Sequence, residues 1–226
     1  MKKPRRLTLA EQAYQEIENR IISGSLPGGH RLLALELASE MELSQTPVKN
    51  ALAALQRDGL VDGEARHGST VRRFTLTDVA EIYEARILLE LHAVERIVAD
   101  GLVTPEFLRT MNGLCDGLAS SLEAGTQDGL AAAVQNDREF HETIVAQLGN
   151  SLISTWHRTA IRQFQTARNY SFATYPKDST IAGHRAIVAA LARKDPAKAV
   201  GVMRWHLEGA RDEMLARAPD DQPIAD

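Results

Sequence analysis

Short stretches of helical periodicity, separated by turn signals, occupy the first third of the chain. Thr8 followed three residues later by Glu11 is the capping-box pattern of a helix start, and the helix it opens ends at Gly24. Apolar residues with the same period predict two further helices over residues 33–41 and 45–58. Three helices are therefore expected at this end of the chain.

The third of these helices has clear boundaries and is followed by a β-hairpin. Ser44 stands in its N-cap position, and Gly59 lies just beyond its end. Two runs of β-forming residues, 60–62 and 69–71, flank a polar segment. The second and third helices have helix-turn-helix proportions, and the hairpin supplies a two-stranded wing behind them.

Beyond residue 77 every long segment has a helical period. Thr77 can cap a helix that runs to about Asp100, and Thr104 with Pro105 opens the next one. The first of these helices turns five apolar residues inward: Ile82, Ala85, Leu89, Ala93 and Ile97. Four more helices are expected over 127–148, 151–170, 179–193 and 196–217. The pattern predicts a mainly α protein whose second part is an all-α antiparallel bundle.

The chain is expected to divide near residue 75. We predict an N-terminal domain over 1–73, a linker over 74–77, a helical domain over 78–218 and a disordered tail over 219–226. Residues 1–73 carry 11 Lys and Arg against 9 Asp and Glu, and the remainder carries 15 against 21. The overall net charge of −4 thus averages a mildly basic front and an acidic back, which suggests different partners for the two parts.

Composition narrows the class of protein. The 226 residues are 44% hydrophobic and 25% charged, as in folded globular domains. A lone Cys115 excludes an internal disulfide framework and fits a reducing compartment. No apolar run approaches the ~18–20 residues of a membrane span, and no signal-peptide core follows the basic start. A cytoplasmic protein is expected, with no membrane partner.

The start of the third helix has the chemistry of a DNA reader. Its N-terminal residues, which in a recognition helix reach base edges in the major groove, are polar. Gln and Asn pair with adenine, Lys with guanine or phosphate, and Ser or Thr with phosphate. The candidate DNA-binding residues are Ser44, Gln45, Thr46, Lys49 and Asn50, with His67 and Gly68 at the wing tip. A small solvated helical domain without a nucleic-acid partner is the alternative.

Three histidines and a carboxylate lie on apolar helix stripes in the second part. Asp137 and His141 lie one turn apart on the stripe of the helix over 127–148, and His184 and His206 lie on the stripes of two later helices. Three imidazoles and a carboxylate suit a divalent transition metal such as zinc, nickel or manganese. Each histidine taken singly is more simply a core residue bonded to backbone. His92 and His157 do not lie on a stripe with other candidate ligands, and we leave them out of the predicted site.

The first part resembles the winged helix of the GntR family of bacterial transcription regulators. The similarity runs through Ile21 to Gly28, Leu43 to Leu52, Asp58 to Val61 and His67 to Val71. It implies binding of double-stranded operator DNA. Where the family has two arginines in its Ser-Arg-Thr-Pro-Val-Arg-Glu segment, this chain has Gln45 and Lys49, with Asn50 after them. We therefore expect a different operator preference, with salt-dependent affinity through Lys49 and the basic residues 2–6.

The second part resembles the FCD effector domain of FadR-like members of that family, over roughly residues 76 to 215. Tyr83 to Glu90, Asp137 to His141, His184 and His206 carry the similarity. It implies that Asp137, His141, His184 and His206 bind a metal at the base of a cavity for a small organic acid, either carboxylic or sugar acid. The family often has Glu where this chain has Gly183, which is not a ligand position. Arg86 matches an arginine that can clamp the acid, and an ion pair with Glu90 one turn on is the equal alternative.

The leading hypothesis is a homodimeric, ligand-responsive transcription regulator and not an enzyme. Paired winged helices suit a pseudo-palindromic operator. Release of repression by the acid is the commoner arrangement in the family that the chain resembles, and the sequence itself leaves repressor and activator open. A regulator that responds to the metal alone is the second hypothesis. A metal-dependent enzyme with a DNA-binding appendage is the third, although no general base is well placed near the metal.

Overall fold

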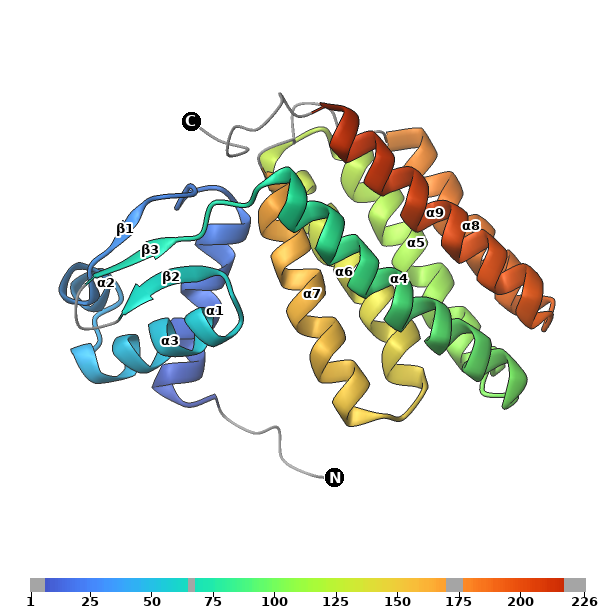
Figure 1. The fold of residues 1–226 in the computed structure, drawn as a ribbon, viewed down its shortest axis with the longest axis horizontal. Helices are drawn as coiled ribbons and strands as arrows, with labels where there is room; N and C mark the ends of the chain where they lie inside the picture. Colours follow the sequence, from blue (N-terminus) through green and yellow to red (C-terminus); the bar gives the residue numbers. More distant parts are fainter. Residues whose placement is uncertain (1–6, 65–67, 170–176, 218–226) are drawn as a thin grey trace. The chain divides into compact units, whose positions relative to one another are not determined.

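The computed structural model describes residues 7–64, 68–169 and 177–217, in two units that meet in sequence between Thr75 and Leu76 (Figure 1). The mainly helical fold expected from the sequence is confirmed. Three predicted features lie outside the described residues: the basic residues 2–6, His67 at the wing tip and the tail over 219–226.

The first unit opens on the predicted capping box. Thr8 Oγ1 accepts from the backbone nitrogen of Glu11 at 3.2 Å, and the Glu11 carboxylate accepts from the backbone nitrogen of Thr8 at 2.7 Å. The elements of the unit are α1 (Leu9–Ile22), β1 (Arg31–Leu32), α2 (Ala34–Glu40), α3 (Gln45–Arg57), β2 (Val61–Glu64) and β3 (Gly68–Val71). Ile17 and Leu55, both fully buried, help form the core between α1 and α3.

The small sheet has three strands, whereas the sequence predicted a two-stranded wing. β3 lies between β1 and β2, and it pairs antiparallel with both (Figure 1). β1 has only two residues, too few to give a readable alternation of apolar and polar side chains. In β2, Gly63 has φ +90°, and a Cβ there would lie 2.5 Å from the Gly68 carbonyl oxygen, so the hairpin requires glycine.

The second unit is a bundle of helices whose starts largely follow the predicted caps. The described helices are α4 (Leu76–Ala99), α5 (Pro105–Ala124), α6 (Gln127–Gln147), α7 (Ser151–Asn169), α8 (Lys177–Ala192) and α9 (Pro196–Arg217). Thr104 caps α5, as predicted, by accepting from the backbone nitrogen of Phe107 at 3.1 Å. The prediction for Thr77 was wrong, because α4 begins at Leu76 and Thr77 therefore lies inside its first turn.

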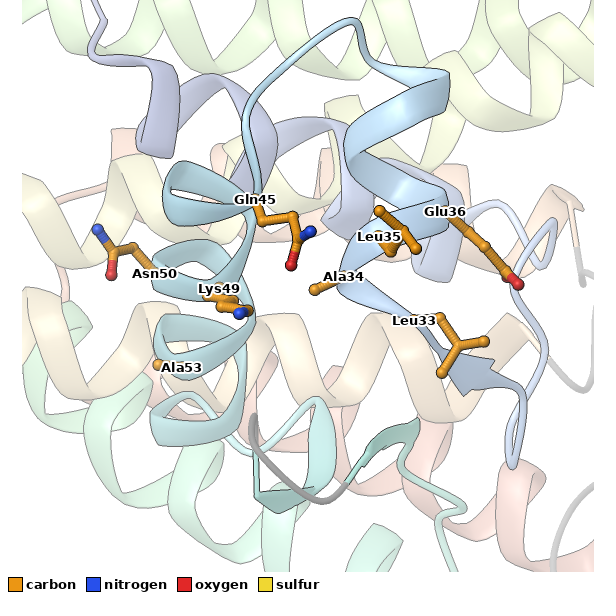
Figure 2. A pocket seen from close by; sticks show the side chains of 8 residues that line it. All are labelled: Leu33, Ala34, Leu35, Glu36, Gln45, Lys49, Asn50 and Ala53. Atoms are coloured by element: carbon orange, nitrogen blue, oxygen red, sulfur yellow. The ribbon is translucent and has the colours of Figure 1, made fainter.

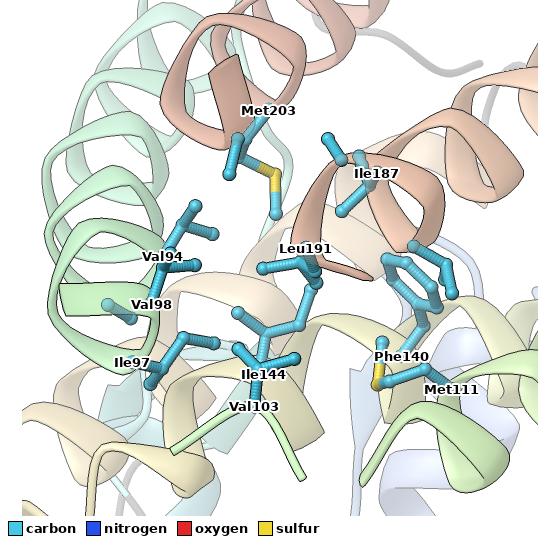
Figure 3. Packing of buried hydrophobic residues seen from close by; sticks show 14 of the residues in the cluster. Val94, Ile97, Val98, Val103, Met111, Phe140, Ile144, Ile187, Leu191 and Met203 are labelled. Carbon is cyan, nitrogen blue, oxygen red and sulfur yellow. The ribbon is translucent and has the colours of Figure 1, made fainter. Parts of the chain in front are cut away.

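Aliphatic side chains from several helices form the core of this bundle (Figure 3). α4 packs along both α9 and α7, so its buried surface is wide. Of the five residues predicted to face inward on α4, three are buried, namely Ile82, Ala93 and Ile97, whereas Ala85 and Leu89 are only half-buried. Arg86 and Glu90 are buried as well. The charged pair was hidden from an apolar pattern because its two members neutralise each other inside the core.

Candidate functional site

Three imidazoles from three helices meet in the second unit. His141 of α6, His184 of α8 and His206 of α9 each offer a nitrogen, and these atoms lie within 4.8 Å of one another. Ring centroids are 4.7 Å apart for His184 and His206, 5.2 Å for His141 and His184, and 5.4 Å for His141 and His206. Side chains so close can share one small cation.

Asp137 completes the set that the helix stripes indicated. It lies one turn before His141 on α6 and is 3% exposed. Its Oδ1 lies 3.3 Å from Nε2 of His184. The structure therefore brings all four predicted metal-site residues together, with His206 half-buried and the other three buried.

The second ring nitrogens of two histidines fix which nitrogen faces the cluster. His184 Nδ1 donates to the Thr180 carbonyl oxygen at 2.7 Å, which leaves the lone pair on Nε2. That nitrogen is buried and has no hydrogen-bond partner among the described residues, although Asp137 lies within ion-pair distance. His141 Nδ1 lies 2.6 Å from Glu90 Oε2, which directs its Nε2 the other way.

This arrangement fits a metal ion. A buried nitrogen without a partner costs about 1–3 kcal/mol, and a cation is the partner that a lone pair can take. Burial lowers the pKa of His206 well below its ordinary value, and the neighbouring His184 and His141 rings lower it further. Burial also lowers the pKa of His141, although the Glu90 carboxylate acts to raise it. Neutral imidazole is the form that binds metal.

A buried charge network lies behind His141. Glu90 accepts from Arg86 Nε at 2.9 Å through Oε1, and the same oxygen lies 3.1 Å from His157 Nε2. Burial alone would raise the pKa of Glu90, but the Arg86 guanidinium and the His141 ring hold it well below its ordinary value. Glu90 is therefore an ionised carboxylate that accepts a hydrogen bond from the Nδ1–H of His141.

Arg86 forms the ion pair with Glu90 that the sequence offered as the alternative to clamping the acid. It is 2% exposed and pairs with Glu90, and its guanidinium carbon lies 4.4 Å from the Phe164 ring centroid. His157, which sequence reasoning set aside, is fully buried in this network, whereas His92 is exposed. The apolar pattern of the sequence could have indicated that His157 is buried, because His157 lies on the same stripe of α7 as Ile161 and Phe164.

Gly183 lies directly against the third imidazole. A Cβ at this position would be 2.6 Å from His206 Nδ1. A glutamate, which the family often has here, cannot occupy this position with His206 in its present place. The departure seen in the sequence thus lets the His206 ring approach the α8 backbone.

The candidate DNA-binding residues lie at the start of α3. Ser44, Gln45, Thr46, Lys49 and Asn50 are all exposed. Ser44 occupies the N-cap position, but its side chain makes no capping hydrogen bond, contrary to the role predicted for it. Gly68 is half-buried in β3.

A hollow of about 980 Å³ is lined by residues of both α2 and α3 (Figure 2). Its lining includes three of the candidate DNA-binding residues together with residues of α2 and of the segment before it. The described residues that line it are Leu33, Ala34, Leu35, Glu36, Gln45, Lys49, Asn50 and Ala53.

Comparison with protein families assigns both units. Residues 81–209 match the FCD domain, and residues 9–71 match the gntR family of bacterial regulatory proteins. Within the described residues, none of the helices is long and apolar enough to cross a membrane.

Curated relatives are transcription regulators. An uncharacterized HTH-type regulator in the TAR-I ttuE-ttuC' intergenic region of Agrobacterium vitis is 36% identical over 59% of this chain and 77% of its own length. A probable D-xylose utilization operon transcriptional repressor of Paenarthrobacter nicotinovorans is 29% identical over 89% of this chain and 87% of its own length. The gluconate operon transcriptional repressor of Bacillus subtilis is 30% identical over 61% and 54%.

Solved structures share the fold. McbR/YncC of E. coli superposes with a TM-score of 0.79 at 21% identity, covering 94% of this chain and 99% of that one. A putative transcriptional regulator GntR from Rhodococcus sp. RHA1 gives a TM-score of 0.79 at 20% identity, covering 93% and 99%.

Proposed function

This chain belongs to the gntR family of bacterial regulatory proteins, carries an FCD domain and is therefore a DNA-binding transcription regulator. We propose that a small organic acid controls its operator affinity through a metal ion in the helical unit. Its families and relatives are regulators, not enzymes. The observation that carries the proposal is the cluster of three imidazoles, in which buried His184 Nε2 lacks a hydrogen-bond partner among the described residues.

Asp137, His141, His184 and His206 would hold the ion, and their donor set suits zinc, nickel or manganese. When bound, a divalent cation offers a positive centre in a low-dielectric site, to which a carboxylate or sugar acid binds. The ion pair of Arg86 with Glu90 favours a structural role for this arginine over a direct contact with the acid.

Control of the operator requires that the acid bind two states of the protein differently. An acid with equal affinity for both states would shift nothing. We assign the DNA-bound state to the acid-free protein, so that the acid releases repression. Two relatives named as repressors of the gluconate and D-xylose utilization operons support this direction. Two copies of the chain would read the two halves of a pseudo-palindromic site.

The test uses the purified full chain with its co-purified metal. Operator fragments are selected from random DNA and titrated with protein in the presence of citrate or D-gluconate, with neutral D-glucose as the matched control. Release by an acid, abolished by EDTA and restored by added zinc, supports the proposal. Release by EDTA or zinc alone would assign the signal to the metal.

A variant isolates the metal site. His184→Ala removes one imidazole of the cluster, and we expect it to lower metal content, measured by elemental mass spectrometry, without loss of DNA binding by the separate winged-helix unit. His92→Ala, an exposed histidine of α4 outside the cluster, is the control. Unchanged metal content in His184→Ala would contradict the four-residue site.

A further inference from the structure

The lining of the hollow between α2 and α3 is unlike that of a phosphate site. Among the described residues of the lining, Glu36 and Lys49 are the only charged ones, and their formal charges cancel. Phosphate contacts are made by an excess of cations, amides and backbone N–H groups. The remaining lining is aliphatic apart from two amide side chains. A surface of this kind is better suited to base edges than to the DNA backbone.

Leu35 is the most exposed large apolar side chain among the described residues of the first unit. It lies on α2 in the lining of the hollow and is 66% exposed, although the unit has an apolar core that contains its neighbour Leu37. Gln45 extends from α3 toward α2 and Leu35 (Figure 2). An apolar side chain and an amide therefore face one hollow at the start of α3.

We propose that this hollow reads A·T pairs, with Leu35 against the C5-methyl group of thymine and Gln45 paired to adenine. The inference rests on the proposed function, since it requires the start of α3 to lie in the major groove. Thymine is the base that presents a methyl group there, and the Gln side chain matches the N6 and N7 edge of adenine. Asn50 adds a second amide of the same type, and Lys49 adds a cation to the lining.

The experiment first selects half-sites from random DNA with the full chain. The expected half-site contains A·T pairs at two or more of the specified positions. Each thymine is then replaced in turn by deoxyuridine, which pairs identically but lacks the methyl group. Loss of one contacted methyl is expected to weaken binding about fourfold, from about 0.8 kcal/mol per buried carbon.

Leu35→Ala identifies the side chain responsible. In this variant the affinity ratio between thymine and deoxyuridine at the sensitive position should fall to about one. Leu9→Ala is the matched control, because Leu9 is 53% exposed in the same unit and does not line the hollow. Its thymine-to-deoxyuridine ratio should stay near fourfold.

Three results would overturn the inference while leaving DNA binding intact. These are half-sites specified by G·C pairs, equal affinity for thymine and deoxyuridine at every position, or undiminished methyl sensitivity in Leu35→Ala. Recovery of no DNA at all would instead overturn the proposed function and the inference with it.

Discussion

Glu90 is the buried carboxylate on which the helical unit's polar side chains converge. It accepts from Arg86, it lies against His157, and it orients His141 through Nδ1 at 2.6 Å. A carboxylate behind a metal-binding imidazole fixes the ring and raises its basicity. Glu90 would therefore act on the metal through His141 without touching the ion.

Replacement of Glu90 separates this role from simple core stability. Glu90→Gln should weaken zinc affinity by about 10–100-fold, because the amide cannot supply the negative charge behind His141. His157→Gln also disturbs the network but does not alter the imidazole cluster, so its zinc affinity should remain near that of the parent protein. Competition with a chromophoric chelator measures the affinity, and circular dichroism checks that both variants are folded. Equal zinc affinity in folded Glu90→Gln and the parent would contradict the role.

Gly183 gives a second prediction at the scale of one residue. Gly183→Ala places a carbon 2.6 Å from His206 Nδ1, so the ring or the α8 backbone must move. We expect zinc affinity to fall by on the order of tenfold or more, as it does when residues that hold metal ligands in place are replaced.

Gly201→Ala on α9 is the control, since its Cβ would meet nothing within 4 Å. That variant should retain zinc and raise the free energy of unfolding by roughly 0.5–1 kcal/mol, because alanine replaces a helical glycine. A zinc affinity that is the same in both variants would show that His206 tolerates the added carbon.

At the scale of the element, two helix starts in the first unit differ in how they are capped. Thr8 bonds the backbone of α1, whereas Ser44 precedes α3 with no capping hydrogen bond. Thr8→Ala should lower the free energy of unfolding by about 1 kcal/mol. Ser44→Ala should cost only a few tenths, because the serine contributes no such bond to the folded state. Denaturant titration of both variants measures the difference, and a similar loss in the two would contradict it. Because the exposed Ser44 hydroxyl makes no capping hydrogen bond, it is available for contact with a phosphate.

Periodicity predicted the helices well because caps and apolar stripes are local. Thr104 with Pro105 gave the start of α5, and Asp137 with His141 gave a shared buried face. Two kinds of feature could not be read in this way. β1 exists through pairing with β3, which is distant in sequence. Glu90 is buried because it neutralises Arg86 inside the core, and a hydrophobic pattern does not register charges that cancel.

At the scale of the whole molecule, charge and exposed apolar surface are unevenly distributed. Residues 1–73 are mildly basic and the remainder is acidic, so the electrostatic attraction for DNA lies in the first unit. The helical unit also exposes large apolar side chains on two neighbouring helices: Leu88 of α4 is 72% exposed, and Leu152 and Trp156 of α7 are each 55% exposed. Exposed apolar side chains on neighbouring helices can form an association surface.

We expect this surface to join two copies of the chain. Trp156→Glu should convert a dimer into a species of 24.8 kDa in light scattering coupled to size exclusion, because burying the new carboxylate would be costly. Leu9→Glu, at a site 53% exposed in the first unit, should stay dimeric.

The monomeric Trp156→Glu variant should also lose most of its affinity for a pseudo-palindromic operator, since the second winged helix is no longer held beside the first. It should still contact a single half-site. A Trp156→Glu variant that remains dimeric would place the association surface elsewhere. A monomeric parent protein would show that the chain does not form a dimer.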